Sequence, residues 1–300
     1  MASRDLVGFI GIGAMGAPMV RNLVRRDFEL LLHDVVSERA AALAGPSVRV
    51  ASSVGEVAES ARWIVTMLPS LEAIEQVALG REGLVDRMSP GSTMIEMSTS
   101  KPGLSRLISQ SLAQRGVAML DAPVSGTTPA AESATLVAMV GGTAEILELC
   151  RPVLGAMCSQ IYHCGGPGQG NAMKLALNLL VHVPALAAFE AMALAVKVGL
   201  DPVTLLDLLA NGPAGSPIVL FKLRKAVERD FEPGSSVHVG VKDLELAIDL
   251  AREAGVPMLL PPVALQTYDY AEQAGLGDRD SSVMITLYER LLGIRVAATE

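Results

Sequence analysis

The stretch GFIGIGAMG, residues 8–16, contains the pattern Gly-x-Gly-x-x-Gly at Gly11, Gly13 and Gly16. An apolar, strand-like run comes directly before it, and a helical pattern follows. Glycines at this spacing permit a tight turn, a close approach of the backbone to a pyrophosphate, and close packing of the helix on the strand. The sequence therefore predicts a dinucleotide site at the positive end of that helix. The contacting residues are expected to be Gly11, Gly13, Ala14 and Met15.

Asp34 follows the second apolar run, Glu29–His33, and lies eighteen residues after Gly16. A carboxylate at the end of this strand accepts hydrogen bonds from both hydroxyls of an adenosine ribose and repels a 2′-phosphate. The sequence therefore predicts NAD as the preferred cofactor. Arg39 is close enough to weaken this discrimination, which leaves NADP open as a second cofactor. The alternative for Asp34 is a turn residue at the start of a helix.

Apolar runs typical of buried strands alternate with helical patterns through the first half of the chain. The runs are Leu6–Ile10, Glu29–His33, Trp63–Leu68, Thr93–Met97, Val117–Leu120 and Leu136–Val140. The helical patterns include Ala14–Arg26, Leu71–Leu79, Leu104–Arg115 and Ala144–Met157. Strands that are apolar throughout and alternate with helices form a parallel sheet covered on both faces. We therefore predict an α/β fold whose N-terminal domain is a Rossmann-type parallel sheet.

A glycine-rich segment, residues 165–170, separates this region from the rest of the chain. After it come helical patterns: a long one over about 169–198, and shorter ones at Pro202–Asn211, Ile218–Arg229, Val241–Ala254 and Pro262–Ala274. We therefore predict a dinucleotide-binding domain at 1–164 and an all-α substrate and oligomerisation domain at 165–300. The long helix joins the two.

The composition argues against proteins that bind nucleic acids by stacking bases on aromatic side chains. Half of the 300 residues are apolar, but only one Trp, four Tyr and five Phe are present. Proteins that stack nucleic-acid bases need aromatic rings. A formal net charge of −8 also does not attract a phosphate backbone. We therefore expect no nucleic-acid partner, and we expect local sites to hold any small anion.

Cysteine and histidine usage argues against a metal site and favours a reducing compartment. Cys150, Cys158 and Cys164 form no Cys-x-x-Cys pair, and the four histidines have no ligand-like spacing. The most apolar stretch, Leu175–Val196, carries several polar residues, which favours a buried helix over a membrane span. We expect a cytoplasmic protein with no secretory signal at Met1–Asp5, no membrane association and no metal.

Three further segments carry a family resemblance. They are DAPVSG at 121–126, GQGNAMK at 168–174 followed by Asn178, and KDLELA at 242–247. Together with GFIGIGAMG they resemble the β-hydroxyacid dehydrogenase family, typified by 3-hydroxyisobutyrate dehydrogenase. The resemblance extends from Gly8 to about Pro257. It implies a Rossmann domain, a long interdomain helix and an all-α domain.

The resemblance also implies roles for individual residues. Lys174 stands at the position of the family's acid/base lysine, and Asn178 at that of the asparagine that binds the reacting substrate. The implied contacts with the substrate, including its carboxylate, are Ser125, Gly126, Thr127, Lys242 and Asp243. The implied contacts with the cofactor, beyond the glycine turn and Asp34, are Met67, Leu68, Pro69, Ser98, Thr99 and Lys242.

The chemistry of alcohol oxidation is consistent with these roles. A base must take the hydroxyl proton while a hydride moves to the nicotinamide. Lys174 and Asn178 are four residues apart on the predicted helix, so they share one face and reach one hydroxyl. Apolar neighbours and nearby positive charge would lower the pKa of Lys174 and make it a base near neutral pH. The alternatives are a lysine that extends to solvent and, for Lys242 and Asp243, a solvated ion pair.

The chain departs from the family's pattern at the substrate end. Thr127 stands where a second glycine is common, Leu177 where an asparagine is frequent, and Ser235 where a phenylalanine is common. We therefore predict an NAD(H)-dependent oxidoreductase that interconverts a small 3-hydroxy acid and its semialdehyde or keto form. We expect its substrate not to be 3-hydroxyisobutyrate itself.

Two other functions are alternatives. A non-catalytic dinucleotide-binding scaffold on the same fold has no need of the pair formed by Lys174 and Asn178. An imine reductase has the same architecture but lacks a lysine at this position. The apolar C-terminal half further predicts a homodimer or homotetramer formed through the all-α domain. The remaining expected partner is a small carboxylate-bearing substrate.

Overall fold

The computed structural model describes residues 6–298, and the chain divides into two compact units, Met1–Lys174 and Leu175–Glu300. Met1–Asp5, where we expect no secretory signal, lies outside the described residues. The boundary predicted at 164/165 coincides with the glycine-rich segment. The structure instead groups the first turn of the long helix with the first unit, because backbone groups there bind the end of a strand.

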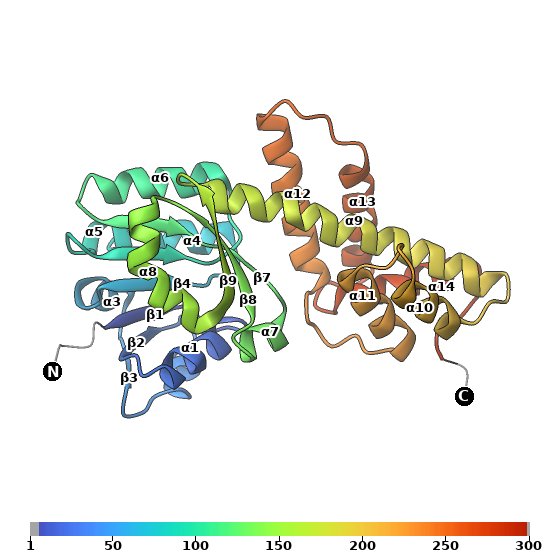
Figure 1. Cartoon of the computed structure of the whole chain (residues 1–300), viewed down its shortest axis with the longest axis horizontal. Coiled ribbons are helices and arrows are strands. Elements are labelled where there is room, and N and C mark those ends of the chain that lie inside the picture. Colours follow the sequence, from blue (N-terminus) through green and yellow to red (C-terminus); the bar gives the residue numbers. More distant parts are fainter. Residues whose placement is uncertain (1–5, 299–300) are drawn as a thin grey trace. The chain divides into compact units, whose positions relative to one another are not determined.

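Nine strands form one sheet in the described part of the first unit, in the order β3-β2-β1-β4-β5-β6-β8-β7 with β9 beside β8 (Figure 1). The strands are β1 (Val7–Ile10), β2 (Leu30–His33), β3 (Val48–Val50), β4 (Trp63–Thr66), β5 (Thr93–Glu96), β6 (Ala118–Asp121), β7 (Val124–Ser125), β8 (Leu136–Gly141) and β9 (Cys158–Gly165). All neighbours from β3 to β6 are parallel. This is the predicted Rossmann arrangement, with the glycine turn after the central strand β1.

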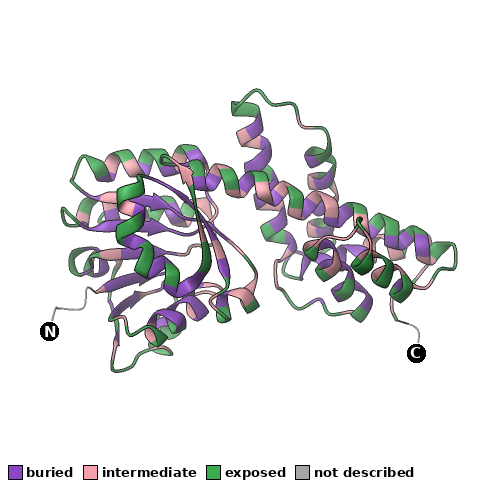
Figure 2. Ribbon diagram, in the orientation of Figure 1, coloured by how far each residue is buried: buried purple, intermediate pink, exposed green. Residues whose placement is uncertain are grey.

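The strand residues alternate between two separate apolar cores. Phe9 and Leu32 pack into one core and Ile10 and Leu31 into the other. Because successive side chains of a strand point to opposite faces, both faces of the sheet are covered. Figure 2 shows the central strands β1, β4, β5 and β6 as almost continuously buried and the covering helices as exposed on their outer sides. The prediction of a sheet with helices on both faces is therefore confirmed.

The helices of the first unit follow the strands. They are α1 (Gly16–Arg25), α2 (Ser37–Ala41), α3 (Val54–Ser60), α4 (Leu71–Leu79), α5 (Leu84–Arg87), α6 (Pro102–Ala113), α7 (Thr128–Glu132) and α8 (Ala144–Met157). Side-chain oxygens of Ser53, Ser70 and Thr143 cap α3, α4 and α8 at their N-termini. These caps satisfy backbone N–H groups that a helix start leaves unpaired.

One end of the sheet differs from the wholly parallel arrangement that the sequence predicts. Strand β8 runs antiparallel to β6 and β7, and β9 pairs parallel with β8. The pattern of apolar runs does not predict strand β9, because most of its residues are exposed or half-buried, as at the edge of a sheet. Strand β7 is not predicted either, because its two residues are too few to form an apolar run.

The second unit is helical. Its elements are the greater part of α9 (Gln169–Lys197), then α10 (Pro202–Asn211), α11 (Pro217–Glu228), α12 (Val237–Glu253), α13 (Leu260–Gln273), the 3₁₀ helix η1 (Ser281–Met284) and α14 (Ile285–Leu292). Phe189, Leu223, Leu244 and Tyr268 lie in its apolar core. The unit therefore has a core of its own, as predicted for an all-α domain.

Helix α9 is long and apolar enough to cross a membrane by length and composition, and no other helix within residues 6–298 meets those criteria. Two of its polar side chains, Asn178 and His182, are buried and hydrogen-bonded to residues of other helices in the second unit. Satisfied buried polar groups are what the core helix of a globular unit requires. The interpretation of this stretch as a buried helix therefore fits its contacts.

Candidate active site

The turn after β1 depends on two of its three glycines for its shape. Gly11 has a φ of +99°, and a Cβ there would lie 2.2 Å from the backbone oxygen of Met67. A Cβ at Gly16 would lie 2.0 Å from the backbone oxygen of Gly11. Gly13 differs, because a Cβ there would have no described heavy atom within 4 Å. Gly11 and Gly16 therefore close the turn, and Gly13 leaves open space beside it.

The N-terminus of α1 is suited to an anion. Among the described residues no side chain caps it at Met15, and its first turn carries no acidic residue. The partial positive charge of a helix N-terminus attracts phosphate groups, and the open space at Gly13 lets them approach the backbone. The residues present thus fit the pyrophosphate of a dinucleotide.

Asp34 joins two loops at the end of β2. Its Oδ2 accepts a hydrogen bond from the backbone N–H of Ile12 at 2.6 Å, and its Oδ1 accepts one from Val36 at 2.8 Å. Arg39 places Nη1 3.7 Å from Oδ1 and is about half exposed. The carboxylate is therefore fixed beside the glycine turn, and its oxygens retain lone pairs for ribose hydroxyls.

The loops after β4 and β5 carry the other predicted cofactor contacts, and they are tied together. The Oγ of Ser98 accepts a hydrogen bond from the N–H of Leu68 at 2.8 Å. A carboxylate oxygen of Glu96 in turn accepts the N–H of Ser98 at 2.7 Å. Met67, Leu68 and Thr99 are half-buried and Pro69 is exposed. The two segments thus form one edge with accessible side chains.

Glu96 is a feature of this edge that sequence reasoning missed. It is 1% exposed, and its Oε2 has no hydrogen-bond partner among the described residues. Burial raises the pKa of Glu96 to about 7. The signal available in the sequence was an acidic residue at the end of an apolar strand, one position before Met97.

The predicted substrate loop follows β7. Ser125 and Thr127 are half-buried. Gly126 has a φ of +130°, and a Cβ there would lie 2.9 Å from side-chain carbons of Ala130 and Leu136. Thr127 stands at the N-cap position of α7 without a side-chain cap. The glycine is therefore needed for the backbone conformation, and the Thr127 hydroxyl is not used to cap the helix.

Asp121, the first residue of the DAPVSG segment, anchors the start of α9. Its two carboxylate oxygens accept the N–H groups of Gly168 at 2.7 Å and Asn171 at 2.8 Å. The side-chain Oδ1 of Asn171 accepts the N–H of Ser100 at 2.7 Å. Burial raises the pKa of Asp121. These contacts fix the turn of α9 that precedes Lys174, which is half-buried.

Within the second unit, the structure brings together three of the predicted residues. Asn178, one turn after Lys174 on α9, donates a hydrogen bond from Nδ2 to Oδ2 of Asp243 at 2.7 Å. The Nζ of Lys242 lies 3.4 Å from Oδ1 of Asp243. Asp243 is 5% exposed, so the pair it forms with Lys242 is not the fully solvated ion pair of the alternative interpretation.

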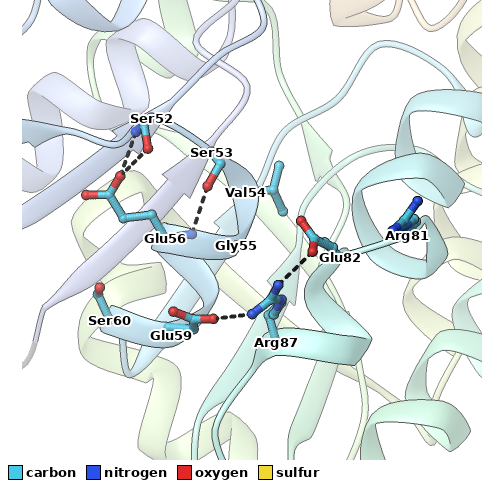
Figure 3. A pocket seen from close by; sticks show the side chains of 10 residues that line it. All are labelled: Ser52, Ser53, Val54, Gly55, Glu56, Glu59, Ser60, Arg81, Glu82 and Arg87. Carbon is cyan, nitrogen blue, oxygen red and sulfur yellow. Dashed lines mark hydrogen bonds and ion pairs between the residues drawn. The ribbon is translucent and has the colours of Figure 1, made fainter.

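A polar pocket of about 550 Å³ lies elsewhere in the first unit (Figure 3). Its residues contact one another: Arg87 pairs with Glu59 and Glu82, and Glu56 accepts hydrogen bonds from Ser52. None of the residues that line it is among the predicted site residues. It therefore lies outside the candidate site.

Comparison with known proteins places the chain in a family. Residues 6–166 match the family model described as the NAD binding domain of 6-phosphogluconate dehydrogenase. Residues 168–288 match the model described as the NAD-binding domain of NADP-dependent 3-hydroxyisobutyrate dehydrogenase. The two matches together cover nearly the whole chain.

Individual relatives are similar over their full length. The 2-(hydroxymethyl)glutarate dehydrogenase of Eubacterium barkeri is 32% identical, over 97% of each chain. The NAD-dependent L-serine dehydrogenase of Pseudomonas aeruginosa is 34% identical, over 96% of this chain and 99% of that one. A structure of the 3-hydroxyisobutyrate dehydrogenase of Mycobacterium tuberculosis with L-serine superposes with a TM-score of 0.86 at 32% identity, over 94% and 98% of the two chains.

Imine reductases share the fold alone. The enzyme from Myxococcus stipitatus in complex with NADP⁺ is 18% identical, with a TM-score of 0.64. The sequence relatives are far more similar, and both family models describe nucleotide-binding domains of dehydrogenases. The chain therefore belongs to the 3-hydroxyisobutyrate dehydrogenase-like β-hydroxyacid dehydrogenases, a family of NAD(P)-dependent oxidoreductases.

Proposed function

We propose that this protein interconverts a small 3-hydroxy acid and its semialdehyde or keto form, with Lys174 as the general acid/base and Asn178 as the residue that binds the reacting oxygen. The observation that carries the proposal is the arrangement at Asn178. Its amide is buried and bound to Asp243, and it lies one helical turn after Lys174. A non-catalytic scaffold has no use for such an arrangement.

Proton transfer is the task of Lys174. In the oxidation direction the substrate hydroxyl proton moves to Nζ, and in the reduction direction the ammonium returns it to the oxygen of the aldehyde or ketone. Bound NAD supplies the hydride acceptor. The amide of Asn178 holds the same oxygen, so that the proton donor and acceptor stay within hydrogen-bond reach.

The substrate carboxylate is assigned to the loop after β7. Ser125 offers a hydroxyl, and the backbone at Gly126 allows a close approach to the N–H groups of the loop. The family resemblance assigns Lys242, which is half-buried, to the substrate and cofactor, where it would add positive charge. These groups explain how a chain of net charge −8 holds a small anion.

The names of the relatives narrow the class of substrate. 2-(Hydroxymethyl)glutarate, L-serine and 3-hydroxyisobutyrate all carry a hydroxymethyl group on the carbon beside a carboxylate. We extend this unit to the substrate of the present protein, with a substituent other than methyl. Thr127 in place of a glycine, and Ser235 in place of a phenylalanine, support a differently shaped pocket.

NAD is the proposed cofactor, with NADP as a weaker substitute. Asp34 would bind the ribose hydroxyls and repel a 2′-phosphate. Arg39, 3.7 Å from the same carboxylate, would soften that repulsion.

We further propose a cytoplasmic homodimer or homotetramer. Large apolar side chains are exposed on the helices and loops of the second unit, including Leu194, Leu200, Leu208, Leu259 and Leu291. These exposed apolar side chains support the proposal, because contact with another subunit would remove them from water. Light scattering coupled to gel filtration measures the subunit number, and a monomer at micromolar concentration would contradict the proposal.

Substitution of the proposed base tests the function. Lys174→Ala is expected to lower kcat by about 10²–10⁴-fold, because general acid/base catalysis contributes that much. NADH binding, followed by fluorescence titration, is expected to stay unchanged. Lys197→Ala removes an exposed lysine from the other end of α9 and serves as the control. A near-normal kcat for Lys174→Ala would refute the assignment.

A substrate panel tests the chemical class. Formation of NADH is measured with 3-hydroxy acids that carry different substituents beside the carboxylate, and its consumption with the matching semialdehydes. We expect the highest kcat/KM for an acid other than 3-hydroxyisobutyrate. The highest value for 3-hydroxyisobutyrate would contradict the proposed difference in the pocket.

A further inference from the structure

Two buried polar residues of the second unit have no role in the proposed reaction so far. They are His182 on α9 and Tyr268 on α13, which are 3% and 1% exposed. His182 follows Asn178 by four residues, so both side chains lie on one face of α9. Helices α9, α12 and α13 carry all the residues involved (Figure 1).

His182 contacts the carboxylate that binds Asn178, and Tyr268 contacts His182. The Nε2 of His182 lies 3.5 Å from Oδ2 of Asp243, the oxygen that accepts the Asn178 hydrogen bond. The Nδ1 of His182 lies 3.1 Å from the phenolic oxygen of Tyr268. The four side chains thus form a continuous buried chain from Asn178 through Asp243 and His182 to Tyr268.

The direction of the hydrogen bonds follows from the chemistry of the groups. A carboxylate only accepts hydrogen bonds, so the amide nitrogen of Asn178 must face Asp243, and the amide oxygen is fixed on the other side. The Nε2 of His182 faces the Asp243 carboxylate, so the ring proton lies on Nε2. Nδ1 is then left to accept a hydrogen bond from the hydroxyl of Tyr268.

A glycine in α12 makes room for this arrangement. A Cβ at Gly240 would lie 2.1 Å from Cε1 of Tyr268, so the tyrosine ring packs directly on the helix backbone. Glycine inside a helix is destabilising relative to alanine. Its presence one turn before Asp243 is explained by the need to hold this ring against α12.

We propose that His182 and Tyr268 are positioning residues for the dehydrogenase reaction, acting through Asp243 to fix the orientation of the Asn178 amide. Tyr268 donates to Nδ1 of His182, His182 directs its N–H at Asp243, and Asp243 holds the amide nitrogen. The amide oxygen and the second amide hydrogen are thereby presented in one orientation. The inference rests on the proposed role of Asn178 in binding the reacting oxygen.

Two single variants of different severity test the proposal. His182→Leu removes the N–H that faces Asp243, and we expect kcat to fall by about 10- to 100-fold, as small misplacements of catalytic groups do. Tyr268→Phe keeps the ring on Gly240 and removes only the hydroxyl, with an expected loss of about 3- to 10-fold in kcat. NADH binding should not change. Tyr270→Phe, at an exposed position on α13, is the matched control.

A double-mutant cycle separates positioning from a merely structural role. In the Asn178→Ala background, His182→Leu and Tyr268→Phe are expected to have no further effect on kcat, because there is no amide left to orient. His182→Gln, which keeps an N–H donor, should recover part of the activity lost in His182→Leu. Losses that multiply with that of Asn178→Ala, or an unchanged kcat in Tyr268→Phe, would overturn the proposal.

The Asn178→Ala variant also distinguishes failure of this inference from failure of the proposed function. A near-normal kcat in Asn178→Ala would remove the assigned role of Asn178 and, with it, the need for positioning. A large loss in Asn178→Ala with unchanged kcat in both Tyr268→Phe and His182→Leu would keep the proposed function and overturn only the positioning role. If His182→Leu fails to fold, Tyr268→Phe, alone and in the Asn178→Ala background, still decides.

Discussion

The two units hold their buried carboxylates in different ways. In the first unit Asp34, Glu96 and Asp121 accept hydrogen bonds from backbone N–H groups, and the cation that faces Asp34, Arg39, is about half exposed. In the second unit, buried Asp243 and Asp280 face the ammonium groups of Lys242 and Lys222, and Asp280 also accepts backbone N–H groups.

The pKa directions follow this difference. Burial raises the pKa of Glu96 and of Asp121, and the backbone N–H groups do not offset it. Burial also opposes ionisation of Asp280, but the Lys222 ammonium and several hydrogen bonds outweigh it, and the pKa of Asp280 lies below its usual value. Asp280 thus ionises more readily than Glu96 and Asp121, because a buried cation accompanies its backbone donors.

The comparison teaches where each unit is sensitive to substitution. In the first unit, the proposed cofactor contacts lie in turns after β1, β2, β4 and β5. The geometry of these turns depends on glycines and on the carboxylates that bind their backbone N–H groups. The polar clusters of the second unit depend on pairs of side chains, so the loss of one partner leaves the other charge buried and unpaired.

The largest effect is expected at Lys222, which is 2% exposed and binds Asp280 at 2.9 Å. Lys222→Met leaves the Asp280 carboxylate without its cation, at an expected cost of about 3–5 kcal/mol in the free energy of unfolding. Urea denaturation measures it. Arg151→Met, which breaks an exposed pair with Glu148, is the control and should have little effect. Equal losses in the free energy of unfolding of the two variants would contradict the idea that the buried cation is what stabilises Asp280.

An intermediate effect, dependent on pH, is expected at Glu96. Its pKa of about 7 in the folded protein lies above its usual 4.5, so between these values the folded state binds more protons than the unfolded state. Its contribution to stability is therefore present below about pH 4.5 and is lost as the pH rises through 7, by about 3 kcal/mol.

Glu96→Gln mimics the neutral form and should remove that loss. We expect the free energy of unfolding of the variant, relative to the original protein, to rise between pH 4 and pH 8. Urea denaturation across this range measures the difference. Parallel curves would mean that the backbone N–H of Ser98 alone keeps Glu96 ionised, against the distinction drawn between the units.

The smallest effect is expected at Asp34, which is more exposed than Glu96 and Asp121, the other buried carboxylates of the first unit. Asp34→Ala should raise the ratio of kcat/KM for NADP to that for NAD by about tenfold, or about 1.4 kcal/mol, because it removes repulsion of the 2′-phosphate. Glu75→Ala changes the net charge equally at an exposed position of α4 and should leave the ratio unchanged. A preference for NADP before substitution would contradict the proposed role.

Much of the fold was predictable because its signals are local. The apolar strands, the glycine turn and the long helix are each encoded in a continuous segment, and the structure has them close to the predicted bounds. Strand β9 was missed because its exposed residues give no apolar run. Helix α14 was missed because its eight residues, partly exposed, form too short a pattern.

The candidate site was predictable only where a motif marks it. Lys174, Asn178 and Asp243 stand in recognisable segments, but their contacts join residues 65 positions apart, which no local pattern encodes. His182 and Tyr268 belong to no motif, and either could have been an ordinary core residue. Glu96 was overlooked because a carboxylate at the end of a strand gains its meaning only when its burial is known.

The double attachment of Asp34 has a consequence for protein engineering. A designer who wants an NADP-dependent variant would first replace this carboxylate, yet the same group holds the N–H of Ile12 in the glycine turn. Asp34→Ala therefore trades cofactor choice against the order of the phosphate-binding loop. Asp34→Asn and Asp34→Ser keep an acceptor oxygen without the charge. They are therefore better starting points for a variant that uses NADP in place of NAD.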